Sequence, residues 1–448
     1  MRIVIAGGGT TGRELALQLA AAHDVVVLEK EKERADELQS VVDGKIIAGD
    51  VMTRTGLERC GLPRAALYIA ACGNNEINLL SCLGAKAAGA NKTAAVIKNS
   101  DYRYMARYLA PCLEAVDLLI DTDAFTAALA AELADDPCLA GKAVFKPKGI
   151  ILSGFILAKN SPLTGREIAA LQKETGGVVC ALVRQERTLK PHGRLVLQEG
   201  DVVYVLDNMG SLTQRQATGG KRRFDRRRIL IWHGGVTGRR IASVLSAEMS
   251  FSNCLLFDPD ESRCVRAAAE LPAVRILQGD LSDAAFFASL APGREDVLLA
   301  TGPDDRENLL VALTAKSCGL ENIVIVVREK KYGTAFRAAG LYRLVSPQEK
   351  ILAAVLDLLY QPFCRFFFPG GGLAAAAIRV TESFKFAWQS MDGRELPDQA
   401  YPGAVVRSGK ILPGTQPALM SGDILLLVLP DGLGEKLLPL LAAGEERK

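Results

Sequence analysis

Residues 2–16 read RIVIAGGGTTGRELA, and residues 228–242, which lie 226 positions later, read RILIWHGGVTGRRIA. Nine of these fifteen aligned positions are identical. Each stretch is a short apolar run, a glycine turn and the start of a helical pattern, which is the order of elements around a bound nucleotide. The repeat predicts two nucleotide-binding units in tandem, one with an intact glycine turn and one with an altered turn.

The composition limits both the architecture and the kind of partner. A chain of 448 residues is too long for one core, and length alone favours about two to four domains. Apolar residues make up 49% and charged residues 23%, as in ordinary globular proteins. Because 54 basic residues nearly cancel 51 acidic ones, we expect no nucleic acid among the partners.

Cysteine usage and hydropathy indicate the compartment. The ten cysteines form no CxxC pair and the chain has only three histidines, which argues against zinc or a disulfide framework and favours the reducing cytosol. Gly7 to Gly12 interrupt the first apolar run, so we expect no signal peptide. With no run of about 20 apolar residues, we expect a cytoplasmic protein without direct membrane insertion.

Apolar runs alternate with helical patterns six times in each half. The expected strands are 3–6, 25–28, 45–47, 67–71, 94–97 and 118–120, then 229–232, 254–257, 274–277, 297–300, 323–327 and 344–346. Strands that alternate with helices form parallel sheets covered on both faces. The expected fold class is therefore α/β, with two Rossmann-like doubly wound parallel sheets.

A different texture of short strands and turns follows each sheet, and it predicts a small α+β module. The two modules repeat one ending, since residues 182–191 and 200–204 parallel residues 405–413 and 421–426. The expected domains are 1–138 (Rossmann-like), 139–220 (small module), 221–368 (Rossmann-like, altered glycine turn) and 369–448 (small module).

Six of the eight residues 221–228, KRRFDRRR, are basic. Such a run suits anionic lipid headgroups or an acidic partner surface, and it equally suits a solvated linker. The sequence leaves both alternatives open.

The first glycine turn is the strongest candidate site. Its residues Gly7, Gly8, Gly9, Thr10, Thr11 and Gly12 follow a strand and open a helix, so that free N–H groups would face a pyrophosphate. Glu29 ends the second strand, where a carboxylate accepts hydrogen bonds from ribose hydroxyls and repels a 2′-phosphate. This favours NAD(H) over NADP(H). Asp50, after the third strand, lies on the adenine side or caps the next helix.

The second turn carries His233 where the first has Gly7, and it keeps Gly235, Gly238 and the carboxylate Asp258. The imidazole either fills the phosphate space or donates a hydrogen bond to a phosphate. If the turn needs a positive φ, we expect the loop to shift, because a histidine rarely takes that conformation.

Other polar residues give no acid–base pair. His23 and His192 fall in expected loops and are interpreted as surface or packing residues. Lys98 and Arg328 each follow the fifth strand of a half, where a cation contacts a phosphate or ribose or faces solvent.

With these residues in place, the chain resembles the TrkA family, the regulatory proteins of Trk potassium uptake systems, which are built from two RCK units (regulators of potassium conductance). The resemblance covers nearly the whole chain. It implies a peripheral subunit at the inner face of the cell membrane that assembles as a homodimer or homotetramer ring. It further implies an integral membrane potassium-translocating subunit as partner, gated according to bound nucleotide.

The resemblance also implies site residues. It assigns Gly7 to Thr11 to the phosphate loop, Glu29 to the ribose, and Cys72, Gly73 and Lys98 to the turns after the fourth and fifth strands. In the second half the matching positions are Gly234 to Gly238, Asp258, Thr301 and Arg328. NAD(H) is the expected cofactor, with ATP or ADP as alternatives because they share the same adenosine diphosphate portion.

By the same resemblance, the apolar segment 351–368 packs across a dimer interface, with packing inside the chain as the alternative. The rival function is an NAD-dependent oxidoreductase, for which the sequence offers no acid–base pair and no substrate domain. A further alternative is the regulation of another potassium channel or efflux system.

Overall fold

The computed structural model describes residues 1–98, 116–145, 150–157, 161–208, 227–248, 253–370, 373–382, 400–414 and 418–429. Contacts within the chain divide it into two compact units. Unit 1 comprises residues 1–125 and 347–361, and unit 2 comprises residues 126–346 and 362–434.

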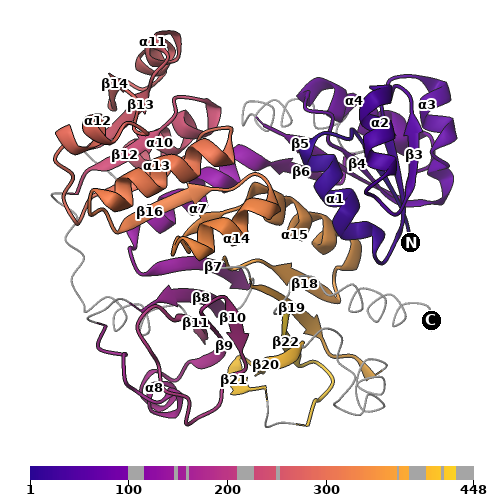
Figure 1. Ribbon diagram of the computed structural model, residues 1–448. Helices are drawn as coiled ribbons and strands as arrows, with labels where there is room; N and C mark the ends of the chain where they lie inside the picture. The colour runs from indigo at the N-terminus through magenta and orange to yellow at the C-terminus, as the bar shows by residue number, and fades with distance from the viewer. Residues whose placement is uncertain are drawn as a thin grey trace. The chain divides into compact units, whose positions relative to one another are not determined.

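Unit 1 is built on a six-stranded parallel sheet with the order β3-β2-β1-β4-β5-β6 (Figure 1). This is the strand order of a Rossmann fold, in which the chain reverses direction beside β1. The elements in chain order are β1 (Arg2–Ala6), α1 (Thr10–Ala20), β2 (Asp24–Glu29), α2 (Lys32–Gln39), β3 (Lys45–Ala48), α3 (Arg54–Arg59), the 3₁₀ turn η1 (Leu62–Arg64), β4 (Ala65–Ala70), α4 (Asn75–Ala87), β5 (Lys92–Ile97) and β6 (Leu118–Asp121).

The sequence explains why these elements form. Residues 3–6 of β1 are fully buried, as expected for a central strand covered on both faces. In α1 the buried positions Gly12, Leu15, Ala16 and Leu19 recur every three to four residues, which places one apolar stripe against the sheet. The carboxyl ends of the parallel strands therefore meet the helix N-termini at one edge, where ligands bind in such sheets.

Unit 2 contains a second parallel sheet with the equivalent order β14-β13-β12-β15-β16-β17. Its elements are β12 (Ile229–Trp232), α10 (Val236–Glu248), β13 (Cys254–Asp258), α11 (Glu261–Glu270), β14 (Arg275–Gln278), α12 (Ala284–Ser289), β15 (Val297–Ala300), α13 (Asp305–Ser317), β16 (Asn322–Val326), α14 (Lys330–Ala338) and β17 (Leu344–Val345). The two parallel sheets confirm the duplication. Observed strand bounds differ from expectation by one or two residues, as for β4.

After each parallel sheet the chain passes into the other unit, within helix α7 (Thr122–Asp135) after the first sheet and at the start of helix α15 (Pro347–Tyr360) after the second. Helix α7 buries an alanine face in the same core cluster as Ile229 and Ile231 of unit 2. Helix α15 contacts α1 and β6 of unit 1, where Lys92 Nζ donates to the Leu358 carbonyl at 2.7 Å. The apolar residues of segment 351–368 that lie in α15 thus pack inside this chain, which was the alternative to a dimer interface.

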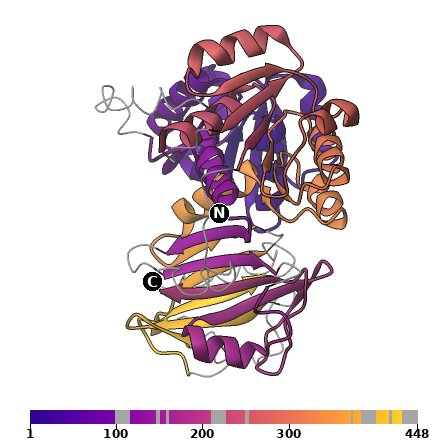
Figure 2. The same cartoon turned by 90° about the vertical axis from the view of Figure 1, so that its left-hand side faces the viewer.

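Two five-stranded antiparallel sheets complete unit 2 (Figure 2). They share one apolar core. The first has the order β10-β9-β11-β8-β7, and the second has the order β18-β19-β22-β20-β21. Their elements are β7 (Leu139–Phe145), β8 (Ile150–Ile156), α8 (Ile168–Thr175), β9 (Val178–Arg184), β10 (Arg187–Leu189), β11 (Val202–Asn208), β18 (Cys364–Phe367), β19 (Ala374–Arg379), β20 (Tyr401–Arg407), β21 (Lys410–Pro413) and β22 (Ile424–Leu429).

The repeated ending of the modules is an ion pair at the same place in each antiparallel sheet. Arg184 forms two hydrogen bonds of 2.8 Å with Asp201, and Arg407 forms two with Asp423 at 2.9 and 2.7 Å. Both carboxylates are buried, so each pair fixes the turn that precedes a central strand.

The basic run 221–228 was interpreted wrongly at its end. Residues 221–226 lie outside the described residues, but Arg227 is buried and donates to the Asp135 carbonyl at 3.2 Å. Arg228 forms a two-pronged ion pair with Asp296. These two side chains are therefore structural, and neither belongs to a solvated linker or a lipid-facing patch.

Within the described part of the chain, no helix is long and apolar enough to cross a membrane. The same residues contain no cluster of metal-ligating side chains, and their cysteines are free thiols.

Candidate functional site

In the turn between β1 and α1, each glycine is present for a different physical reason. Gly7 has φ +96°, and its N–H donates to the Leu28 carbonyl at 2.8 Å. A Cβ on Gly12 would lie 1.8 Å from the Gly7 carbonyl oxygen, so only glycine lets the helix approach the strand. A Cβ on Gly9 would meet nothing within 4 Å. The space above Gly9 is open, as an approaching phosphate requires.

Donors face this open space. Gly9 is the N-cap residue of α1, no side chain caps the helix, and the Gly9 amide has no acceptor among the described residues. Thr10 is exposed and Thr11 half-buried at the first turn. The start of α1 therefore presents amide dipoles to solvent, an arrangement suited to an anion.

Glu29, at the carboxyl end of β2, holds the glycine turn through hydrogen bonds to the backbone. Its Oε2 accepts from the Gly8 amide at 2.5 Å and its Oε1 accepts from the Glu31 amide at 2.9 Å. The Glu29 side chain is only 6% exposed, and among the described residues the cation nearest to it, Arg34 Nη1, lies 3.7 Å from Oε1. This carboxylate is held in place and keeps acceptor capacity for a hydroxyl group.

The second turn repeats the first, and our expectation of a shifted loop is wrong. His233 takes φ +80°, and its N–H donates to Phe257 at 2.9 Å as Gly7 does to Leu28. A Cβ on Gly238 would lie 2.0 Å from the His233 carbonyl oxygen, the same close approach as at Gly12. The helix and strand demand this backbone path, and the histidine accepts the strained conformation.

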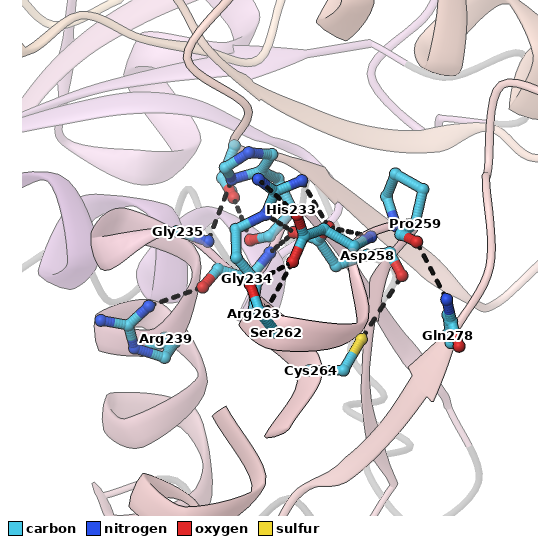
Figure 3. Close-up of polar contacts among 12 residues, drawn as sticks. His233, Gly234, Gly235, Arg239, Asp258, Pro259, Ser262, Arg263, Cys264 and Gln278 are labelled. Atoms are coloured by element: carbon cyan, nitrogen blue, oxygen red, sulfur yellow. Dashed lines mark hydrogen bonds and ion pairs between the residues drawn. The ribbon is translucent and has the colours of Figure 1, made fainter. Parts of the chain in front are cut away.

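What differs in the second turn is the space above it. A Cβ on Gly235 would lie 2.7 Å from Nδ1 and 2.8 Å from Cε1 of His233, and that Nδ1 accepts from the Gly235 amide at 3.0 Å (Figure 3). Of the two alternatives raised by the sequence, the imidazole fills the space.

Family models match both parallel-sheet regions and the first module. The TrkA-N domain matches residues 3–115 and again 229–347, and the TrkA-C domain matches residues 152–212. The two TrkA-N matches together span more than half of the chain. The chain belongs to the TrkA family.

Relatives and solved structures agree over almost the full length. The Trk system potassium uptake protein TrkA homolog of Archaeoglobus fulgidus is 29% identical over 412 residues, which are 92% of this chain and 93% of the relative. The TrkA protein of Halomonas elongata is 24% identical over 96% of each chain. The GsuK RCK domain has a TM-score of 0.64 at 18% identity, covering 99% of this chain and 95% of the other, and therefore shares the fold.

The turn after β4 in the first TrkA-N unit is held by an asparagine whose role the sequence did not reveal. The buried Asn78 accepts from the Cys72 amide at 2.8 Å and donates to the Val96 carbonyl at 2.7 Å. Burial, with Glu29 and Asp50 nearby, raises the pKa of the Cys72 thiol to about 11, so it stays protonated. Gly73, with φ +79°, has open space where a side chain would stand.

The second TrkA-N unit repeats this pair of asparagine hydrogen bonds. Asn308 accepts from the Gly302 amide at 2.8 Å and donates to the Val326 carbonyl at 3.2 Å. The residue structurally matched to Cys72 is therefore Gly302, one position beyond Thr301. Thr301 itself is buried and donates to the Trp232 carbonyl at 2.6 Å. The sequence did carry a signal for this role, because an Asn-Leu-Leu triplet begins at Asn78 and recurs at Asn308.

Asp50 and Lys98 lie at the ends of β3 and β5. Asp50 accepts from the Met52 amide at 2.9 Å and pairs with Lys30 at 3.0 Å, and these contacts lower its pKa. It does not cap α3, because Thr53 does. The exposed Lys98 is positioned through its amide, which donates to Asn75 at 3.0 Å.

Arg328, the counterpart of Lys98, has a fixed side chain. Its Nε donates to the Gly302 carbonyl and its Nη2 donates to Thr237 Oγ1, both at 3.2 Å. The guanidinium thus bridges two turns of the second unit.

The two other histidines lie outside these turns. His23 is buried and, contrary to its sequence context, has a hydroxyl partner in Tyr360. His192 is exposed. Neither offers an acid–base pair with a neighbouring carboxylate among the described contacts.

Proposed function

We propose that this chain is the nucleotide-sensing regulatory subunit of a potassium uptake system, and that the first TrkA-N unit is its sensor. The observation that carries the proposal is the open phosphate position above Gly9. It combines a helix start without a side-chain cap, a Gly9 amide with no acceptor in the described part of the chain, and a fixed carboxylate at Glu29. The names of the TrkA relatives support the link to potassium uptake.

The ligand that best fits these residues is NAD(H). The amides at Gly9, Thr10 and Thr11 would hold the pyrophosphate, and Glu29 would accept from ribose hydroxyls. Asp50, Cys72, Gly73 and Lys98 border the same strand ends and would contact the remainder of the ligand. A solved GsuK channel with TM-score 0.63 is described as bound to NAD. ATP and ADP share the adenosine diphosphate portion and are the alternative ligands.

Regulation would follow from differential binding. A nucleotide that binds one arrangement of the chain more tightly than another shifts their populations, and an integral membrane subunit would respond to that arrangement. No step of this kind transforms the ligand. The proposal places the chain at the cytoplasmic face of the membrane, as a homodimer or a homotetramer ring.

A substitution that fills the open position tests the proposal. Gly9 has φ −65° and ψ −174°, so Gly9→Glu introduces no backbone strain and brings a carboxylate to the phosphate position. In calorimetry on the full chain, NADH binding should be lost in Gly9→Glu and weakened less in Gly9→Ala, whose single methyl group takes up less of the open space and carries no charge. Cells whose uptake depends on this chain should lose nucleotide-responsive potassium uptake with Gly9→Glu.

Two outcomes would contradict the proposal. One is an unchanged uptake response in Gly9→Glu after its NADH binding has been shown to be lost. The other is steady consumption of NADH absorbance with a candidate substrate, which would support the oxidoreductase instead.

A further inference from the structure

We infer that the second TrkA-N unit is closed by its own side chains, with His233 at the phosphate position and Arg263 on the ribose carboxylate, so that the chain takes one nucleotide. The inference rests on the proposed function, because the first unit defines what these positions bind. The two turns share one backbone frame, and only the side chains above it differ.

His233 supplies the acceptor that a phosphate oxygen would supply. The ring nitrogen Nδ1 lies 3.0 Å from the Gly235 amide nitrogen, which is the counterpart of the Gly9 amide. The ring atoms Nδ1 and Cε1 occupy the volume directly above Gly235, where a Cβ would meet them at 2.7 and 2.8 Å. A phosphate and this imidazole cannot occupy the position together.

The protonation state of the ring suits this contact. Burial lowers the pKa of His233; the Asp258 carboxylate opposes this effect, and Arg263, Arg328 and Arg239 add to it. The neutral ring keeps a lone pair on Nδ1, which is what an N–H donor requires.

Asp258 is saturated in a way that Glu29 is not. Its Oδ1 accepts from the Asp260 amide at 2.8 Å and from Arg263 Nη2 at 2.7 Å. Its Oδ2 accepts from the Gly234 amide at 2.7 Å and from Arg263 Nε at 2.8 Å. The carboxylate is fully buried. With four donors on two oxygens, it has no acceptor site left for a ribose hydroxyl.

Arg34 shows that close guanidinium hydrogen bonds to this carboxylate are specific to the second TrkA-N unit. Arg34 follows Glu29 by five positions, as Arg263 follows Asp258. Arg34 instead pairs with Glu31 at 2.9 Å and stays 3.7 Å from Glu29. The same helix position therefore leaves the ribose carboxylate available in the first unit and occupies it in the second.

A further arginine reinforces the closed turn. Arg239 Nη1 donates to the Gly234 carbonyl at 2.7 Å (Figure 3). Its Nε pairs with Glu270 at 2.7 Å. Together with Arg328, which joins Thr237 to Gly302, it uses its charge to hold the turn. Arg239, Arg263 and Arg328 are thus all engaged by the chain itself.

Stoichiometry with NADH as the probe tests the inference on the full-length chain. The native chain should bind one NADH per chain, and Gly9→Glu should bind none. The double variant H233G/R263A should bind two, and adding Gly235→Glu to it should restore one. Arg266→Ala, which removes an exposed cation from the same helix α11, is the matched control and should still bind one.

Two results would overturn the inference. The first is NADH binding that persists in Gly9→Glu and disappears on Gly235→Glu, a test that needs no opened variant to fold. The second is an H233G/R263A chain that keeps the native circular dichroism and first-site affinity and still binds one NADH. If the native chain binds no NADH, the proposed function fails. The inference is still decided by whether H233G/R263A gains one bound NADH per chain, which supports it, or gains none, which overturns it.

Discussion

Nε2 of His23 lies 3.1 Å from the hydroxyl oxygen of Tyr360, a residue 337 positions later in the chain. His23 follows the end of α1, Tyr360 is the last residue of α15, and both side chains are buried in unit 1. The contact joins the first Rossmann sheet to the helix that follows the second one in sequence. The duplicated chain thus completes each half with a helix from the other.

This histidine gives unit 1 a pH-dependent stability. Burial, with a smaller contribution from the amino terminus, lowers the pKa of His23 from 6.5 to about 4. Between these values the unfolded chain binds a proton that the folded chain does not. Stability is therefore complete above about pH 6.5 and falls as the pH drops toward 4, by about 3 kcal/mol. The free energy of unfolding, measured in urea for the native protein and for His23→Gln, should depend less steeply on pH in the variant. Parallel pH dependences of the two proteins would contradict the assignment.

The glycines of the first turn should separate folding from binding. A Cβ on Gly12 would lie 1.8 Å from the Gly7 carbonyl oxygen, whereas one on Gly9 meets nothing within 4 Å. We expect Gly12→Ala to lower the free energy of unfolding by about 1–3 kcal/mol, since the helix must move away from the strand. Gly9→Ala should leave it unchanged. Equal unfolding midpoints in urea for the two variants would show that the close approach is not what Gly12 provides.

The ion pair of the first module should contribute to stability where an exposed pair does not. Asp201 is fully buried and accepts two hydrogen bonds from Arg184 and one from the Gln198 amide. Removing its charge in Asp201→Asn should cost about 2 kcal/mol, as for other charge-assisted hydrogen bonds. Glu58→Gln, which breaks the exposed pair with Arg54, is the control and should have no measurable effect. A thermal denaturation midpoint that is unchanged in Asp201→Asn would refute the assignment.

Glu29 should make the first TrkA-N unit selective for NADH over NADPH. A 2′-phosphate would be placed beside the carboxylate of a side chain that is only 6% exposed, where like charges repel strongly. We expect at least about tenfold tighter binding of NADH, which corresponds to about 1.4 kcal/mol. The ratio of the two dissociation constants should narrow in Glu29→Gln. Equal affinity of the native chain for both dinucleotides would rule out this role.

Much of the fold was predictable because its signals are local and repeated. The apolar run at residues 3–6, the glycine turn and the helical stripe each follow from spacing, and their recurrence predicted the second sheet. The partners of α7 and α15 were not predictable, because an apolar helix face does not specify which sheet covers it. For the same reason the burial of Arg227 was missed: a basic run in sequence looks solvated until its carbonyl partner, at Asp135, is known.

At the candidate site, the sequence predicted positions and missed conformations. It placed Gly7, Glu29 and Asp258 at strand ends, where the structure has them. It could not show that His233 would take φ +80° with its ring over Gly235, because the usual preference of histidine points to another backbone path. The neighbouring strand and helix outweigh that preference. Saturation of Asp258 by Arg263 depends on side-chain geometry that spacing alone does not specify, since Arg34 has the same spacing and stays 3.7 Å from Glu29.

The measurement that tests the central claim most directly is an equilibrium titration of the full-length native chain with NADH, scored as ligand bound per chain. The open position at Gly9 and the filled position at Gly235 predict a stoichiometry of one. A stoichiometry of two would show that the second unit binds despite His233, and the absence of binding of NADH, ATP and ADP would contradict the assignment of the first unit as a nucleotide sensor.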